Sequence, residues 1–150
     1  MSLAWLSPEE RSHALSYLEE RFGIPPEAFR RHRLFRRGEH VCALHEDAAP
    51  AADVLSSIQA GLRLLKETQS GGFKPSSRGM QVFGRWANRN LVDLSDAELR
   101  AVLQGQSLPQ AGSRGFVLLR QGGAVIGVGL VRDGQLVSQI PRSMTIYLAG

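Results

Sequence analysis

Residues 115–140 read GFVLLRQGGAVIGVGLVRDGQLVSQI, and this stretch decides the fold. Its three β-rich runs are separated by Gly122-Gly123 and by Asp133-Gly134. Both dipeptides favour tight turns between antiparallel strands, because such turns need residues that tolerate a positive φ. The stretch therefore predicts a three-stranded meander, which we interpret as part of a small β-barrel in the C-terminal half of the chain.

Helix signals lie upstream of this meander. The segment Ser7–Glu10 has the spacing of a capping box, in which a serine and a glutamate three residues later bond each other's backbone N–H groups. It predicts a helix that ends at Gly23. The segment Ser95–Glu98 repeats the signal and predicts a helix that ends at Gly105. A further helix is expected from about residue 77 to residue 87.

Strand signals occupy most of the remaining sequence. Two short runs with strand character flank Gly38-Glu39 and predict a hairpin. Over residues 54–66 we expect two short strands that bend at Gly61, with a short helix over residues 51–59 as the alternative. Further short strands are expected over residues 91–94 and 144–148.

The order of these elements predicts an α+β protein. A helix-plus-hairpin domain is expected over residues 1–60, and a small β-barrel domain with adjoining helices over residues 61–150. A length of 150 residues allows one medium domain or two small ones. Hydrophobic residues make up 43% of the chain and charged residues 21%, which supports a folded core and excludes a disordered protein.

No catalytic or metal-binding pattern stands out in the sequence. The single cysteine, Cys42, cannot form a disulfide within the chain, and we interpret it as a small buried hydrophobic residue. No glycine-rich phosphate loop or nucleophile–base pair is present, so we expect no enzyme, no cofactor and no metal. The N-terminal residues lack signal-peptide character, and no apolar run approaches the roughly 20 residues of a membrane span. We therefore expect a cytoplasmic protein without a membrane partner.

The charge of the chain is positive and comes from arginine. The net charge is +4, and Lys66 and Lys74 are the only lysines. Arginine carries a planar fork that grips phosphate and stacks on bases, so its dominance favours a nucleic-acid partner. The alternative is a genome rich in G and C, which raises the arginine content without a functional reason.

Basic residues form three groups that are candidates for RNA contact. Arg78, Arg85 and Arg89 recur at i, i+7 and i+11, which predicts a basic stripe on one helix face, opposite a side that carries Met80, Val82 and Phe83. The C-terminal part from residue 99 onward has five arginines and a single acidic residue. The third group comprises Arg30, Arg31, Arg33, Arg36 and Arg37. The alternative for this group is a solvated strand edge that blocks the addition of further strands.

Two stretches of the chain resemble a known domain. They are GLRLLKETQSGGFKPSSRGMQVFGRWANRNLVDLSDAELRAVLQGQSL, residues 61–108, and GFVLLRQGGAVIGVGLVRDGQLVSQIPR, residues 115–142. Both resemble the PUA-like domain at the C-terminus of Fmu/Sun-type RNA cytosine-5 methyltransferases, and similar domains occur in small ribosome-assembly proteins of archaea and eukaryotes. The most specific motif is the closing G-x-G-L-x-R-D-G-x-L-x-S-Q-I-P-R. The segment FGIPPEAFRRHRLFRRGEHVCAL, residues 22–44, more loosely resembles the α+β pre-PUA domain that precedes the barrel in such proteins.

This resemblance implies RNA binding through the barrel and its adjoining helix. The sequence departs from the methyltransferases because their catalytic domain, with its S-adenosylmethionine site and two catalytic cysteines, is absent from it. Residues 143–148, SMTIYL, also stand where family members often continue with basic residues. The resemblance carries over Lys74, Pro75 and Ser76 before the helix, and Pro141 and Arg142 after the last strand. The predicted RNA-binding set is Lys74, Ser76, Arg78, Arg85, Arg89, Arg132 and Arg142, with the group Arg30, Arg31, Arg33, Arg36 and Arg37 as a secondary contact.

The function expected from the sequence is non-catalytic RNA binding in rRNA or tRNA modification or in ribosome assembly. Its expected partners are structured RNA and an RNA-modifying enzyme or pre-ribosomal particle. One alternative is a protein–protein adaptor, which would need an exposed apolar patch such as Trp5 with Leu3 and Leu6. The other is a small enzyme, which would need a pocket with perturbed carboxylates or histidines.

Overall fold

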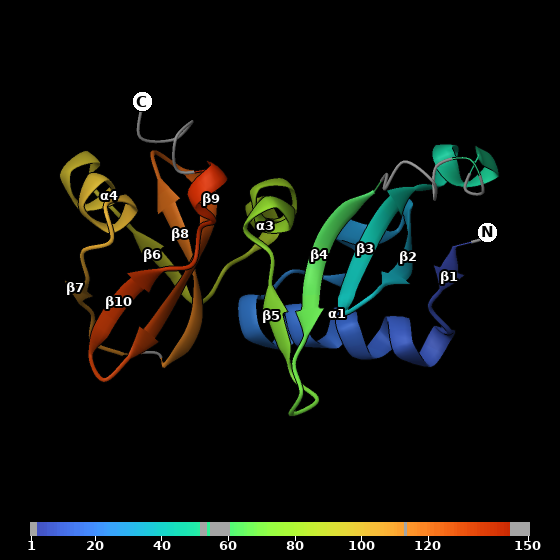
Figure 1. Ribbon diagram of the computed structural model, residues 1–150, viewed down its shortest axis with the longest axis horizontal. Helices are drawn as coiled ribbons and strands as arrows, with labels where there is room; N and C mark the ends of the chain where they lie inside the picture. Colours follow the sequence, from blue (N-terminus) through green and yellow to red (C-terminus); the bar gives the residue numbers. More distant parts are fainter. Residues whose placement is uncertain (1–2, 52–53, 55–60, 113, 145–150) are drawn as a thin grey trace.

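Two five-stranded sheets make up most of the molecule (Figure 1). The computed structural model describes residues 3–51, 54, 61–112 and 114–144. The first sheet has the strand order β1-β2-β3-β4-β5, and the second has the order β6-β8-β9-β10-β7.

The first sheet is antiparallel throughout, and the helix α1, Pro8–Phe22, packs against it. The predicted hairpin is confirmed, because β2 and β3 pair in register on either side of Gly38, which has a φ of 59°. The strands are β1 Ala4–Trp5, β2 His32–Arg37, β3 His40–His45, β4 Leu62–Glu67 and β5 Phe73–Pro75. Short 3-10 helices, Pro26–Phe29 and Glu46–Ala51, lie before β2 and after β3.

The second sheet contains the predicted meander, which is confirmed. The strands β8, Gly115–Gln121, β9, Ala124–Arg132, and β10, Gln135–Ser138, pair as consecutive antiparallel neighbours. The edges are β6, Leu91–Asp93, which is parallel to β8, and β7, Leu108–Pro109, which is antiparallel to β10. In the described residues β6 does not pair with β7, so the sheet is curled but is not closed into a barrel.

Both predicted capping boxes are confirmed. The Ser7 hydroxyl accepts from the backbone N–H of Glu10, and the Glu10 carboxylate accepts from the backbone N–H of Ser7. Ser95 and Glu98 form the same pair at the start of α4, Asp96–Leu103. Gly23 ends α1 with a φ of 75°, as expected for a left-handed helix cap.

The helix α3, Ser77–Phe83, lies between the two sheets (Figure 1). On one side Gly79 packs against β4, and a Cβ atom at this position would lie 2.7 Å from the carbonyl oxygen of Arg63. On the other side the hydroxyl of Ser77 accepts a hydrogen bond of 3.0 Å from the backbone N–H of Val128 in β9. The predicted helix over residues 77–87 was too long, because the α-helix ends at Phe83 and a 3-10 turn, Gly84–Trp86, follows.

The main hydrophobic core is shared by both sheets. Leu18 of α1 and Leu64 of β4 belong to the same buried cluster as Leu118, Val125 and Val128 of the second sheet. A smaller cluster lies between the second sheet and α4. The structure therefore joins its two sheets through apolar packing that is continuous from α1 to β9.

The end of α1 adds polar contacts to this junction. The Arg21 guanidinium donates to the carbonyl oxygen of Phe116 at 2.7 and 2.9 Å and to that of Arg114 at 3.0 Å. The backbone N–H of Asn88 donates to the carbonyl oxygen of Phe22 at 2.9 Å. The Arg21 contacts fix the start of β8, and the Asn88 contact fixes the segment that leads from α3 into β6.

Some predictions concern the middle and the end of the chain. The second of the two strands expected over residues 54–66 is confirmed as β4, whereas the first strand and its helical alternative lie outside the described residues except for Val54. The strand expected over residues 144–148 also lies outside them, except for Met144. The division into domains at residues 60 and 61 stays a prediction, although β4 and β5 extend the first sheet to Pro75. No helix among the described residues is long and apolar enough to cross a membrane.

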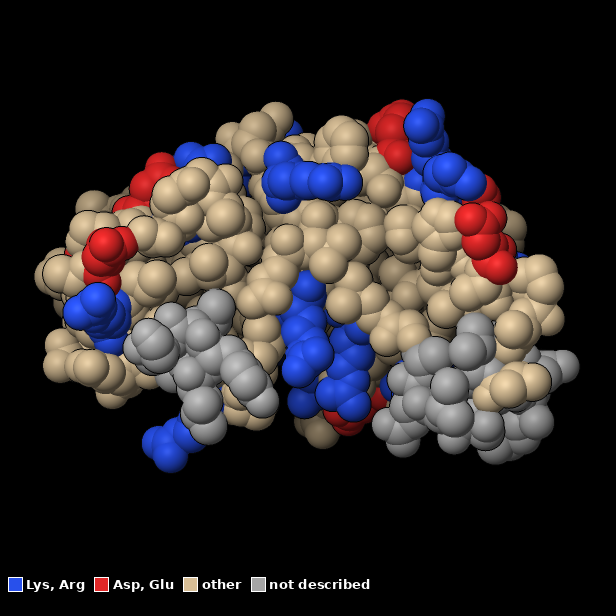
Figure 2. Space-filling view, turned by 90° about the horizontal axis from the view of Figure 1, so that it is seen from above, with Lys and Arg blue, Asp and Glu red and all other residues tan. Residues whose placement is uncertain are grey.

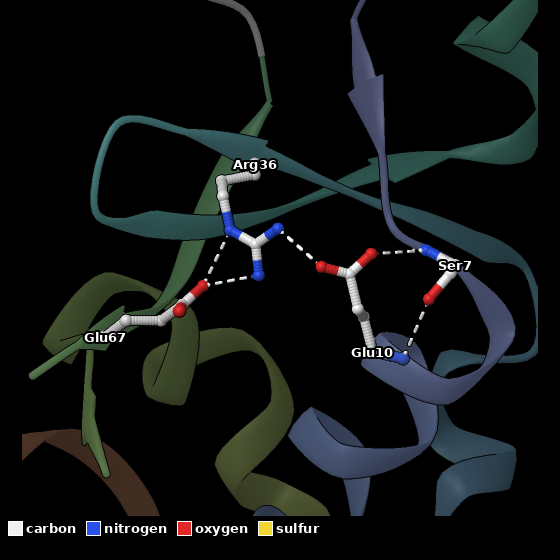
Figure 3. Close-up of polar contacts among 4 residues, drawn as sticks. All are labelled: Ser7, Glu10, Arg36 and Glu67. Atoms are coloured by element: carbon white, nitrogen blue, oxygen red, sulfur yellow. Dashed lines mark hydrogen bonds and ion pairs between the residues drawn. The ribbon is translucent and has the colours of Figure 1, made fainter. Parts of the chain in front are cut away.

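An ion-pair network ties α1 to the first sheet (Figure 3). Arg36 of β2 donates to the Glu10 carboxylate at 2.7 Å and to the Glu67 carboxylate at 2.7 and 2.8 Å. The hydrogen bond from the Ser7 backbone and the contact with Arg36 lower the pKa of Glu10 from 4.5 to about 2. Glu10 therefore serves the helix cap and the helix–sheet contact at once.

We expect this network to make the stability of the protein depend on pH. Because the pKa of Glu10 is lower in the folded protein than in the unfolded chain, its contribution is complete above about pH 4.5 and is lost as the pH falls to about 2. Urea unfolding should show Glu10→Gln to be less stable than the parent at pH 7. The free energies of unfolding of the two proteins should converge as the pH falls to about 2. Glu9→Gln, on the same turn, is the matched control. A Glu10→Gln difference that stays constant with pH would contradict this assignment.

Candidate nucleic-acid interface

A groove of about 470 Å³ opens where α3 begins, between the two sheets. One wall comes from the start of β4, and the other from the segment that follows β10. The groove is lined by Gly61, Leu62, Arg63, Ser76, Ser77, Arg78, Pro141, Ser143 and Met144.

The charge of the groove is positive. Of the described residues that line it, Arg63 and Arg78 are charged, both are exposed, and none carries a carboxylate. Among the described residues, neither guanidinium has a hydrogen bond or an ion pair with another protein group. Figure 2 shows basic side chains gathered at the middle of this face of the molecule. Two uncompensated guanidinium groups beside one hollow form a suitable site for a phosphate backbone.

Two of the three serines that line the groove are already engaged in the fold. The hydroxyl of Ser76 caps α3 by accepting from the backbone N–H of Gly79 at 3.3 Å. The hydroxyl of Ser77 is buried and bonds to Val128. The positive charge that the groove offers to an anion comes from the arginines, and the predicted role of Ser76 stays a prediction.

The predicted stripe of Arg78, Arg85 and Arg89 on one helix face is wrong. Arg78 lies on α3, Arg85 lies on the 3-10 turn, and Arg89 lies beyond it and donates to the carbonyl oxygen of Glu20 at 3.2 Å. The expected apolar side is also wrong in part, because Val82 is 47% exposed. The structure brings Arg78 into the groove and leaves Arg89 at the end of α1.

Three more of the predicted RNA-binding residues, Arg142, Lys74 and Arg132, are not among the described residues that line the groove. Arg142 is exposed and stands between two lining residues, Pro141 and Ser143. Lys74 lies on β5 opposite Lys66 and is half-buried. Arg132 stands beside the β9–β10 turn, at the end of β10 opposite to the groove. These assignments stay predictions.

The group between Arg30 and Arg37 is largely occupied by contacts within the protein. Arg31 pairs with Glu46 at 2.8 Å, and the Arg33 guanidinium lies 3.8 Å from the centre of the Trp5 ring. Arg36 belongs to the network of Figure 3, and Arg37 lies over the Phe35 ring. The secondary RNA contact stays a prediction, and these contacts reduce the charge that the group offers to a phosphate.

Sequence reasoning missed Arg63. It is the outward-facing residue at the start of β4, next to the buried pair Leu64 and Leu65. Its significance arises only because β4 and the start of α3 lie side by side, since the backbone N–H of Ser76 donates to the carbonyl oxygen of Leu64 at 2.9 Å. The sequence did not define where this strand begins, so it could not show that Arg63 would lie beside the start of α3.

Two further hollows suit a phosphate less well. The hollow along α4, of about 550 Å³, is lined by Asp96 as well as Arg100, so its charge is mixed. The hollow beside α1, of about 490 Å³, contains Glu20, and its Arg21 already donates to backbone carbonyls. Burial raises the pKa of Tyr17 in this second hollow to about 12, so the ring stays uncharged at neutral pH.

Two further predictions concern apolar side chains of the first sheet. The exposed patch of Trp5, Leu3 and Leu6 is wrong, because Trp5 packs edge-on against buried Phe35 with 5.9 Å between ring centres. Leu3 belongs to the same cluster, and Leu6 packs on the main core. Cys42 is fully buried as predicted, and burial raises the pKa of its thiol.

The chain is similar to one family model and to two curated proteins. Residues 89–146 match the family model described as "Methyltransferase RsmF PUA domain". Two curated relatives carry the name "Ribosomal RNA small subunit methyltransferase F". The one from Aeromonas hydrophila subsp. hydrophila is 25% identical over 141 residues, which are 93% of this chain and 29% of the relative. The one from Psychromonas ingrahamii is 25% identical over 117 residues, which are 74% of this chain and 24% of the relative. The chain thus spans less than a third of either relative.

A solved structure is similar over nearly the whole chain. It is the crystal structure of a PUA domain from Aeropyrum pernix K1 in a tartrate complex, with a TM-score of 0.53 and 16% sequence identity. The match covers 99% of this chain and 78% of that one. The fold is therefore PUA-like, with mixed α and β content and a curled sheet.

Proposed function

Because the chain carries a PUA-like domain of the kind found in Fmu/Sun-type methyltransferases, we propose that it is a non-catalytic RNA-binding protein. The names of its relatives support a place in rRNA modification, and the proposal also includes tRNA modification and ribosome assembly. In this proposal its partners are structured RNA and an RNA-modifying enzyme or pre-ribosomal particle. The N-terminal part would act as a pre-PUA-like domain.

The observation that carries the proposal is the pair of uncompensated arginines, Arg63 and Arg78, in one groove. RNA presents a continuous row of phosphates, and each phosphate neutralised by an arginine releases condensed counterions. The groove would bind backbone phosphates, with Arg142 beside it as a further contact. Lys74, Ser76, Arg85, Arg89 and Arg132 remain candidate contacts, and so do Arg30, Arg31, Arg33, Arg36 and Arg37.

The double variant Arg63→Gln/Arg78→Gln tests this proposal. We expect its affinity for a small-subunit rRNA fragment at about 50 mM salt to fall about tenfold, because two phosphate contacts are lost. The slope of log K against log salt should become shallower by about 1.4 to 1.8, at roughly 0.7 to 0.9 per phosphate. Fluorescence anisotropy with end-labelled RNA at several salt concentrations measures both quantities.

The matched control removes the same charge elsewhere. Arg100→Gln/Arg114→Gln changes two exposed arginines that do not line the groove. We expect this control to bind RNA almost as tightly as the parent. Equal losses in both double variants would mean that total charge, not the groove, determines binding. No binding of the parent protein to an rRNA fragment, a tRNA or duplex RNA at about 50 mM salt would overturn the proposed function.

A further inference from the structure

The outward face of α3 and the following 3-10 turn carries basic and apolar side chains together. Arg78 and Val82 are exposed on α3, four residues apart and therefore on one side of the helix. Arg85 and Trp86 are exposed on the 3-10 turn that follows. The opposite side faces the core through Gly79, Met80 and Phe83, which are buried.

Apolar exposure on this face is unusual for the molecule. Trp86 is 46% exposed and Val82 is 47% exposed. The other tryptophan, Trp5, is covered by Phe35 and by the Arg33 guanidinium. Two large apolar side chains left exposed on one short segment form an open apolar surface that a ligand can cover.

The charges around Trp86 are positive. The guanidinium of Arg85 lies 5.4 Å from the centre of the indole ring, and Arg78 lines the groove two helical turns away. No acidic residue occurs between Glu67 and Asp93 in the sequence. An exposed aromatic ring with one arginine beside it and a second arginine on the same short segment suits a polyanion that also presents flat rings, which describes single-stranded RNA.

We propose that Trp86 is a stacking platform for an unpaired base of RNA. The inference rests on the proposed function and adds the single-stranded character of the ligand. In this arrangement Arg63 and Arg78 hold backbone phosphates in the groove, the strand continues along α3, and one base lies on the indole beside Arg85. Val82 supplies apolar contact for the sugar or the base edge.

The same face could in principle bind a protein, but the observations favour RNA. One indole and one valine offer far less apolar area than the roughly 800 Å² per partner of a stable protein interface. Stacking of a base needs only one open ring.

Tryptophan fluorescence tests the stacking directly. The chain has two tryptophans, so Trp5→Phe leaves Trp86 as the only reporter. We expect a single-stranded oligouridine of about ten nucleotides to quench this fluorescence on binding, because the base contacts the indole. An abasic ribose-phosphate strand of the same length should bind through its phosphates and leave the fluorescence unchanged.

Affinity measurements separate stacking from phosphate binding. Trp86→Ala should weaken oligouridine binding about tenfold with an unchanged salt slope, since no phosphate contact is lost. Trp86→Phe, which keeps an aromatic ring, should recover most of the loss. For the abasic strand, Trp86→Ala should bind like the parent.

Each outcome decides between the two proposals. Unchanged oligouridine affinity of Trp86→Ala, or the absence of quenching in Trp5→Phe, would overturn the stacking proposal and leave RNA binding by the groove in place. Loss of abasic-strand binding in Trp86→Ala would also overturn it, because the side chain would then act on the fold. If the parent binds neither strand and no structured RNA, the proposed function itself fails.

Discussion

Gly79→Val is expected to lower the free energy of unfolding by about 3 kcal/mol. A Cβ atom at position 79 would lie 2.7 Å from the carbonyl oxygen of Arg63 and 3.0 Å from the Cα atom of Leu64. Both are backbone atoms of β4, so they cannot move aside without breaking strand pairing. Valine is the better helix former by only about 0.5 kcal/mol, which does not offset the overlap. α3 would have to move away from the sheet.

Urea unfolding followed by circular dichroism measures this loss. Gly72→Ala is the matched control, because its added Cβ would make only an ordinary contact, 3.4 Å from the Thr68 hydroxyl. We expect the control to change stability by less than about 0.5 kcal/mol. A loss below about 1 kcal/mol in Gly79→Val would mean that α3 packs less closely on β4 than its contacts indicate.

Ser77→Ala is expected to lower the free energy of unfolding by about 2 kcal/mol. The hydroxyl of Ser77 is the acceptor for the backbone N–H of Val128, and both residues are buried. Its removal leaves that N–H without a partner and out of reach of water, which costs more than the hydrogen bond itself contributes. The loss should occur at the contact between α3 and the second sheet.

Hydrogen exchange measures the expected loss at the Val128 amide itself. The amide of Val128 should exchange faster in Ser77→Ala than in the parent, relative to amides in β2 and β3. Ser12→Ala is the matched control, because Ser12 is exposed on α1 and its side chain has no hydrogen bond within the described part of the chain. Unchanged protection of Val128 would show that another group or a water molecule takes over as acceptor.

Local signals in the sequence were sufficient for most of the elements. The capping boxes at Ser7 and Ser95 and the turn at Asp133-Gly134 involve residues close together in the chain, so their chemistry can be seen in a short window. The meander and the PUA-like character also followed from the stretch between Gly115 and Arg142. These predictions depend little on what packs against each element.

The candidate site depended on packing, and there the sequence was insufficient. A helix of seven residues gives too few turns for periodicity to choose its buried face, so the exposed Val82 was placed on the apolar side. The close approach at Gly79 decides that face, and it requires the neighbouring strand to be known. Arg63 was missed for the same reason.

The shared core bears on how short a folded fragment of this chain can be. The family model matches residues 89–146, but Leu118, Val125 and Val128 within that range pack in one cluster with Leu18 of α1 and Leu64 of β4. Cutting the chain at residue 89 would expose this apolar surface to water. We therefore expect residues 89–146 alone not to fold as an independent unit, because α1 and the first sheet supply part of the second sheet's interior.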